Sequence, residues 1–227
     1  KHGTVTAVIN NRKFEITSFR KDLKTDGRHA DVDFSEDMEE DAARRDFTIN
    51  ALYLDKFGKF YDFHDGFDDI NNRKIRFIGD PEKRVSEDYL RIMRFFRFSA
   101  MMQLMNDNKE ILEIFKNHHK KLDVISNERL WHEFSGLLKS EDPSNALKEM
   151  QEVGILKDHF CNCSISQSFD ILISVETKIK YPINHIFRLS VLLNNDQEKI
   201  NNFISKYTLT KSESTELSSY SQLNKKK

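Results

Sequence analysis

The hydrophobic pattern of this sequence changes at Gly79-Asp80-Pro81, and this change limits the folds that the chain can adopt. Before it, residues 3–9 and 13–20 alternate as strands do, on either side of the turn signal Asn10-Asn11. After it, apolar residues recur at helical spacing and no pair of strands is evident. We therefore expect an α+β fold with a mixed part over residues 1–80, an all-helical part over 81–211 and a polar tail over 212–227.

In the first part, the two strands predict a hairpin, and Glu15 lies on its second strand. Residues 21–35 lack periodicity and contain Asp26-Gly27, which predicts a loop. Ser35 is expected to cap a helix over residues 36–54, because the first turns of that segment are acidic. The segment 57–79 predicts short strands and turns.

In the second part, the periodicity predicts helices over residues 82–105, 108–121, 127–140, 142–153, 165–180, 183–193 and 196–206. The tail is rich in Ser and ends in three Lys, so we expect it to fray.

Composition excludes several classes of protein. The chain has 227 residues, with 36 Lys and Arg against 37 Asp and Glu, and no apolar run approaches the ~20 residues of a membrane span. Two cysteines cannot build a disulfide scaffold, and Cys161-Asn-Cys163 beside His159 lacks the four ligands of a zinc site. No secretory signal is evident. We expect a cytoplasmic protein with no membrane partner. The first residue is Lys, and a strand pattern begins almost at once. We therefore also expect this sequence to be a piece of a longer protein.

A row of charges marks the segment after Pro81. On a helix from Arg84 to Met102, Arg91 and Arg94 share a charged arc with Asp88, and Arg97 lies near its edge. One interpretation is a solvated face with ion pairs such as Arg84–Asp88. The other is a nucleotide site, since Arg suits bidentate contacts with phosphates and base edges. Residues 71–100 are locally basic, with 8 Lys and Arg against 4 Asp and Glu, which favours the second interpretation.

Several ordered motifs resemble one known family. The run Asp41-Ala-Ala-Arg-Arg-Asp-Phe-Thr-Ile-Asn-Ala-Leu52 resembles the arginine-arginine-aspartate motif of bacterial-type (class II) tRNA nucleotidyltransferases and poly(A) polymerases. The run from Asp80 to Phe98 resembles their nucleotide-selecting motif, and Asn127 to Phe134 resembles a later helical motif. Asp65-Gly66 and the hairpin fit in order and spacing. The resemblance covers about residues 1–160.

The resemblance implies a polymerase-beta-like head domain followed by a helical neck and body that contact tRNA. It implies an enzyme that adds C and A to tRNA 3′ ends from CTP and ATP. Asp88 and Arg91 would pair with the base edge, and Arg94 and Arg97 would contact the triphosphate. Arg45 and Asp46 would bind the phosphates and ribose.

The family's chemistry uses two metal ions, expected to be Mg²⁺, held by clustered carboxylates. The resemblance places its main Asp-x-Asp pair before residue 1, so we expect it to be absent from this sequence. Asp31-Val-Asp33 has the same letters without the preceding glycines, and we interpret it as coincidence. Glu15 is the candidate third catalytic carboxylate, and the alternative is an exposed strand residue.

Three hypotheses follow, because the sequence has the nucleotide-selecting motifs and lacks the main metal-binding pair. The first is a CCA-adding enzyme or a poly(A) polymerase-type relative, in a truncated or split form. The second is a catalytically inactive nucleotide- or RNA-binding fragment. The third is a partner that completes its active site with a separate N-terminal fragment, which an unpaired hairpin edge would favour. The sequence alone leaves open whether the chain is an active enzyme.

Overall fold

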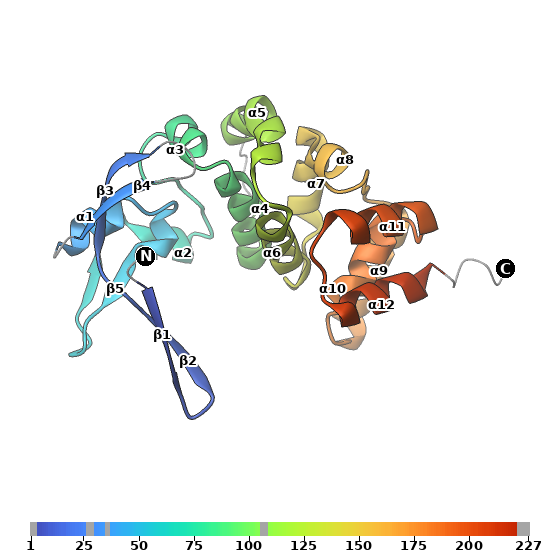
Figure 1. The fold of residues 1–227 in the computed structure, drawn as a ribbon, viewed down its shortest axis with the longest axis horizontal. Coiled ribbons are helices and arrows are strands. Elements are labelled where there is room, and N and C mark those ends of the chain that lie inside the picture. Colours follow the sequence, from blue (N-terminus) through green and yellow to red (C-terminus); the bar gives the residue numbers. More distant parts are fainter. Residues whose placement is uncertain (1–3, 26–29, 35–36, 105–108, 222–227) are drawn as a thin grey trace. The chain divides into compact units, whose positions relative to one another are not determined.

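The computed structural model describes residues 4–25, 30–34, 37–104 and 109–221 (Figure 1). The chain divides into two compact units. Unit 1 contains Lys1–Asn72 and Arg76–Asp88, and unit 2 contains Arg73–Ile75 and Tyr89–Lys227. Unit 1 holds the described strands and unit 2 is built from helices, so the expected α+β class is confirmed.

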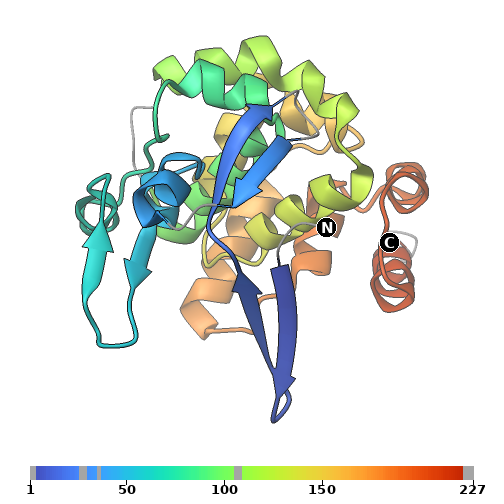
Figure 2. The same ribbon diagram turned by 60° about the vertical axis from the view of Figure 1, so that its left-hand side comes forward.

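The predicted first hairpin is confirmed in unit 1 (Figure 2). Strands β1 (Thr4–Ile9) and β2 (Arg12–Thr17) pair antiparallel, with Thr6 opposite Glu15. Asn10 and Asn11 both have positive φ, at 49° and 61°, which suits the tight two-residue turns of hairpins. The apolar side chains of this hairpin remain largely exposed, and that of Ile16 is 60% exposed.

A second hairpin replaces the loop expected over residues 21–35. Strands β3 (Arg20–Thr25) and β4 (Ala30–Phe34) pair antiparallel, so the loop prediction is wrong for the described part. The backbone supplies the hydrogen bonds of a strand pair, so residues without apolar alternation can still form one. Asp31-Val-Asp33 lies in β4, whereas Ser35 and Asp26-Gly27 lie outside the described residues.

The helix expected over residues 36–54 is much shorter. Helix α1 (Met38–Ala43) is capped by Asp37, whose carboxylate accepts a bond from the Glu39 backbone at 2.8 Å. The chain then forms the 3-10 turn η1 (Thr48–Asn50) and strand β5 (Leu52–Leu54). Phe47 is fully buried, and its backbone bridges to Phe77. This tertiary pairing ends the helical path that the local sequence favoured.

The Asp65-Gly66 motif begins a short helix after a third pair of strands. Strand β6 (Phe60–Asp62) pairs with β5, and helix α2 (Gly66–Asn71) follows. Asp62 caps α2 by accepting bonds from the Gly66 and Phe67 backbones at 3.0 and 2.9 Å. A Cβ on Gly66 would lie 2.2 Å from the Thr48 carbonyl oxygen, so only glycine fits there.

The helix expected over residues 82–105 is broken. Helix α3 (Pro81–Glu87) ends at Asp88, whose backbone is extended at φ −152° and ψ 105°. Helix α4 (Leu90–Met102) begins after the break. Phe95, which a continuous helix places on the charged arc, is fully buried in unit 2 and packs against Phe115 at 5.1 Å between ring centroids.

Unit 2 is a succession of helices that share an aromatic core. Phe134 and Phe160 stack with ring centroids 4.0 Å apart, and Trp131 packs edge-on against Phe203. After α4, the described helices are α5 (Lys109–His118), η2 (His119–Val124), α6 (Asn127–Leu138), α7 (Ser144–Val153), α8 (Ile155–His159), α9 (Gln167–Ile179), α10 (His185–Leu192), α11 (Gln197–Lys206) and α12 (Lys211–Tyr220).

Helix α12 occupies most of the segment expected to fray. Thr210 and Glu213 form a capping box at its start, and Leu217 is fully buried. The capping box and the buried Leu217 therefore stabilise a helix here, although the composition of the segment is polar. Across the described parts of the chain, no helix combines the length and the apolar character needed to cross a membrane.

Gly66→Ala should destabilise unit 1. The added methyl group meets backbone atoms that cannot rotate away, so we expect a loss of about 3 kcal/mol. Amide hydrogen exchange of η1 and α2 measures the effect. Gly58→Ala is the control, because no atom lies within 4 Å of its added Cβ and only its positive φ of 83° carries a cost. Equal effects of the two substitutions would contradict the steric argument.

Candidate nucleotide-binding site

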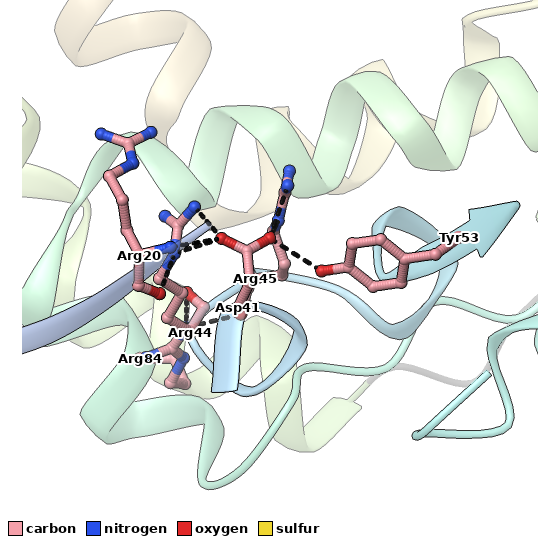
Figure 3. Close-up of polar contacts among 6 residues, drawn as sticks. All are labelled: Arg20, Asp41, Arg44, Arg45, Tyr53 and Arg84. Atoms are coloured by element: carbon pink, nitrogen blue, oxygen red, sulfur yellow. Dashed lines mark hydrogen bonds and ion pairs between the residues drawn. The ribbon is translucent and has the colours of Figure 1, made fainter. Parts of the chain in front are cut away.

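The carboxylate of Asp41 organises the arginine-arginine-aspartate motif in unit 1 (Figure 3). Asp41 is only 1% exposed. One oxygen accepts the Arg44 Nε at 2.9 Å and the Arg20 backbone N–H at 3.2 Å. The other accepts the Arg45 Nε and Nη2 at 3.1 and 2.8 Å and the Tyr53 hydroxyl at 2.8 Å. Both arginines therefore have fixed orientations, while 38% of the Arg45 side chain stays exposed.

These donors determine the ionisation of Asp41. Burial alone would raise its pKa, but the hydrogen bonds from Arg45, Arg44 and Tyr53 outweigh burial and lower the pKa from 3.8 to about 2. The same burial and the bond to the carboxylate raise the pKa of Tyr53 to about 12. Asp41 is thus a carboxylate, and Tyr53 a neutral donor, at any ordinary pH.

Asp46 lies beside Arg45 and faces the 3-10 turn. Its Oδ1 atom accepts the Phe47 backbone N–H at 2.9 Å and the Asn50 amide at 3.0 Å. Asp46 is 8% exposed, so the turn holds this carboxylate in one place. Asp69, on α2, accepts hydrogen bonds from the Thr48 hydroxyl at 2.5 Å and from the Arg76 Nε at 2.8 Å.

Arg84, which one interpretation of the sequence paired with Asp88, binds several groups of unit 1. Arg84 donates to the Glu87 carboxylate at 2.6 Å and to two backbone carbonyls at the end of α1. Asp88 ends α3 as a half-buried residue of unit 1. Arg91 lies in the first turn of α4, in unit 2.

In unit 2, a buried carboxylate on α6 holds two of the predicted arginines. Glu133 is 4% exposed and accepts the Arg97 Nε at 2.5 Å, with the Arg94 Nη1 at 3.8 Å. A Cβ on Gly136 would lie 2.7 Å from the Arg97 side chain, so this glycine leaves room for it. Arg94 keeps 30% of its side chain exposed, and Arg97 keeps 19%.

Some of these contacts escaped the sequence analysis. Tyr53, Glu133 and the anchoring role of Asp41 carried no prediction. For Asp41 a signal existed, since it precedes the two arginines by three and four residues, the spacing of helical ion pairs. Glu133 gave a weaker signal, as an acidic residue within the apolar face of α6.

The resemblance to the nucleotidyltransferase family implies a divalent metal, and the described residues do not form a site for one. No group of three or more His, Cys, Asp or Glu residues with suitable geometry occurs among them. Glu15 lies on the exposed strand β2, opposite Thr6. Cys163 is buried, and burial raises its pKa, which matches a reduced structural thiol.

Comparison with known proteins defines the class. The family described as "Poly A polymerase head domain" matches residues 1–76. The family described as "Probable RNA and SrmB-binding site of polymerase A" matches residues 105–160. The chain belongs to the bacterial-type (class II) family of tRNA nucleotidyltransferases and poly(A) polymerases.

Individual relatives are CCA-adding enzymes. The chain is 41% identical over 157 residues to the mitochondrial CCA tRNA nucleotidyltransferase 1 of Danio rerio, covering 68% of this chain and 36% of that one. It is 32% identical over 216 residues to the CCA-adding enzyme of Staphylococcus aureus, covering 90% and 53%. The crystal structure of the Bacillus stearothermophilus CCA-adding enzyme in complex with CTP matches with a TM-score of 0.75 and 27% identity, covering 98% and 54%. The chain thus spans between about a third and about half the length of these relatives.

The pKa of Asp41 provides a test of the hydrogen bonds that Asp41 accepts from Arg44, Arg45 and Tyr53. Tyr53→Phe removes one donor, so the pKa of Asp41 should rise from about 2 toward 3.8, as followed by carboxyl carbon NMR. Because the folded pKa is depressed, the stabilisation is present above about pH 4 and is lost as the pH falls through 2. At about 1.4 kcal/mol per pKa unit, it amounts to about 2 kcal/mol. The Tyr61→Phe variant, whose hydroxyl binds Asp55 instead, is the control. An Asp41 midpoint near 3.8 in the unaltered chain would contradict the described network.

Arg97→Met should destabilise unit 2 by about 3 kcal/mol, because it leaves the buried Glu133 without its closest partner. Trp131 lies on α6 together with Glu133 and is 6% exposed, so its fluorescence reports the unfolding of unit 2 in urea. Arg129→Met changes an exposed residue of α6 and should cost much less. A similar loss in both variants would show that Glu133 does not depend on Arg97.

Proposed function

We propose that this chain acts in tRNA nucleotidyl transfer and adds C and A to tRNA 3′ ends from CTP and ATP. The observation that carries this proposal is the family's arginine-arginine-aspartate motif, fixed by the buried Asp41 carboxylate. We propose unit 1 as the nucleotidyltransferase head and unit 2 as the helical part that contacts tRNA. The relatives' names support this, since they are CCA-adding enzymes and tRNA nucleotidyltransferases.

Asp88 and Arg91 would select the nucleotide through its base edge. A carboxylate accepts a hydrogen bond from an exocyclic amine, and a guanidinium donates to ring or carbonyl acceptors. Cytosine and adenine both carry such an amine, so one Asp and one Arg can accept both bases and reject uracil and guanine. Arg45 and Asp46 would bind the phosphates and ribose, and Arg94 and Arg97 would contact the triphosphate.

Nucleotidyl transfer also needs Mg²⁺, and we propose that its main ligands come from outside the described residues. Glu15 would contribute a third carboxylate beside them. Apolar side chains of the first hairpin are exposed, such as Val5 at 65% and Ile16 at 60%. This exposure supports the proposal that another polypeptide segment packs against the hairpin. A separate N-terminal fragment is one source of it, and restoration of activity by such a fragment tests this.

Two finer assignments belong to the same proposal. We propose a cytoplasmic location. Some relatives are named mitochondrial, so cell fractionation is needed to test this location. A poly(A) polymerase-type activity is the alternative reaction. It would extend RNA with repeated A and without CTP.

Arg91→Ala should weaken CTP and ATP binding by about ten- to a hundredfold, because a hydrogen bond to a charged group contributes roughly 1.5–3 kcal/mol. Calorimetric titration with CTP, ATP, UTP and GTP measures this, and Arg129→Ala is the control. Unchanged CTP and ATP affinity in Arg91→Ala would rule out its assigned role. Labelled CTP and ATP incorporation into tRNA lacking CCA then tests whether the chain transfers nucleotides alone.

A further inference from the structure

Arg84 connects two segments of unit 1 that lie far apart in the sequence (Figure 3). Its Nη2 atom donates to the carbonyl oxygens of Arg44 at 2.6 Å and Arg45 at 2.5 Å. Its Nη1 atom donates to Glu87 at 2.6 Å, within α3. The side chain is 11% exposed, so these bonds are largely shielded from water.

Arg44 is the C-cap residue of α1 and Arg45 follows it directly, so their carbonyl groups lie at and just beyond the C-terminal end of this helix. The last carbonyl groups of a helix have no partner within the helix and carry partial negative charge. Basic side chains in the last turn commonly meet this need, but α1 has none. Arg84 supplies the positive charge from a position 40 residues along the chain from Arg44.

We propose that Arg84 is a positioning residue that sets the distance between the phosphate-binding and base-reading parts of the nucleotide site. Arg45 is held twice, by Asp41 at its guanidinium and by Arg84 at its carbonyl. Asp88 follows Arg84 by four residues at the end of α3. One guanidinium therefore links the Arg45 backbone to the helix that presents Asp88. The inference rests on the proposed function, in which Arg45 and Asp88 contact opposite ends of one nucleotide.

This role predicts a specific pattern of binding. A ligand that touches both ends gains affinity only when the two contacts are held at a matching distance. A ligand that touches the phosphate end alone is insensitive to that distance. CTP and ATP are ligands of the first kind, and inorganic tripolyphosphate is of the second.

Arg84→Lys is the decisive variant, because lysine keeps the charge but lacks the planar fork of donors. We expect CTP and ATP to bind about tenfold more weakly in Mg²⁺ buffer, and tripolyphosphate to change less than twofold. Arg76→Lys is the matched control, since Arg76 binds Asp69 and the His64 carbonyl elsewhere in unit 1. It should leave all three affinities unchanged.

Other outcomes separate this inference from the proposed function. Equal weakening of tripolyphosphate and CTP, or unchanged CTP and ATP affinity, would overturn the positioning role. An unaltered chain that binds neither CTP nor ATP would remove the proposed function and this inference with it.

Amide hydrogen exchange of the unaltered chain tests the inference without a variant, in case Arg84→Lys does not fold. If Arg84 fixes residues 44–46 in advance, these amides exchange slowly and CTP slows them little further. Strong additional protection by CTP would show that the nucleotide, rather than Arg84, orders this segment.

Discussion

The buried charge of Asp41 is the interaction on which unit 1 depends. A carboxylate with 1% exposure is tolerated only when donors replace its lost water, and these donors come from β3, from the end of α1 and from β5. Satisfying one charge therefore brings together segments that have little apolar surface of their own. It also offsets the repulsion between the adjacent Arg44 and Arg45 guanidiniums, since each binds one oxygen of the same carboxylate.

Unit 2 uses the same physical device. Glu133 is buried on α6 and holds Arg97 closely and Arg94 more loosely. In each unit a protein carboxylate fixes one edge of an arginine and leaves part of the side chain exposed, 38% for Arg45 and 19% for Arg97. An arginine held this way loses less conformational entropy when it meets a phosphate, which is how preorganisation raises affinity.

Local patterns predicted the features that local physics controls. The first hairpin follows from alternation and Asn10-Asn11, and the helices of unit 2 follow from apolar periodicity. The family motifs predicted which arginines and aspartates bind the nucleotide, and those roles stay predictions. What escaped prediction depends on distant partners: Arg84 binds carbonyls about 40 residues away, and Phe77 ends the helical path near Phe47. The capping box at Thr210 was readable but was masked by a polar composition.

The break at Asp88 shows why such partners matter to the site. On one continuous helix, Arg84 and Arg91 would lie seven residues apart and face the same side. Arg84 is already committed to the carbonyls of Arg44 and Arg45, so a continuous helix would direct Arg91 to the same protein surface. The extended backbone of Asp88 removes that constraint. Arg84 can then serve the architecture of unit 1, while Arg91, Arg94 and Arg97 follow the separate phase of α4.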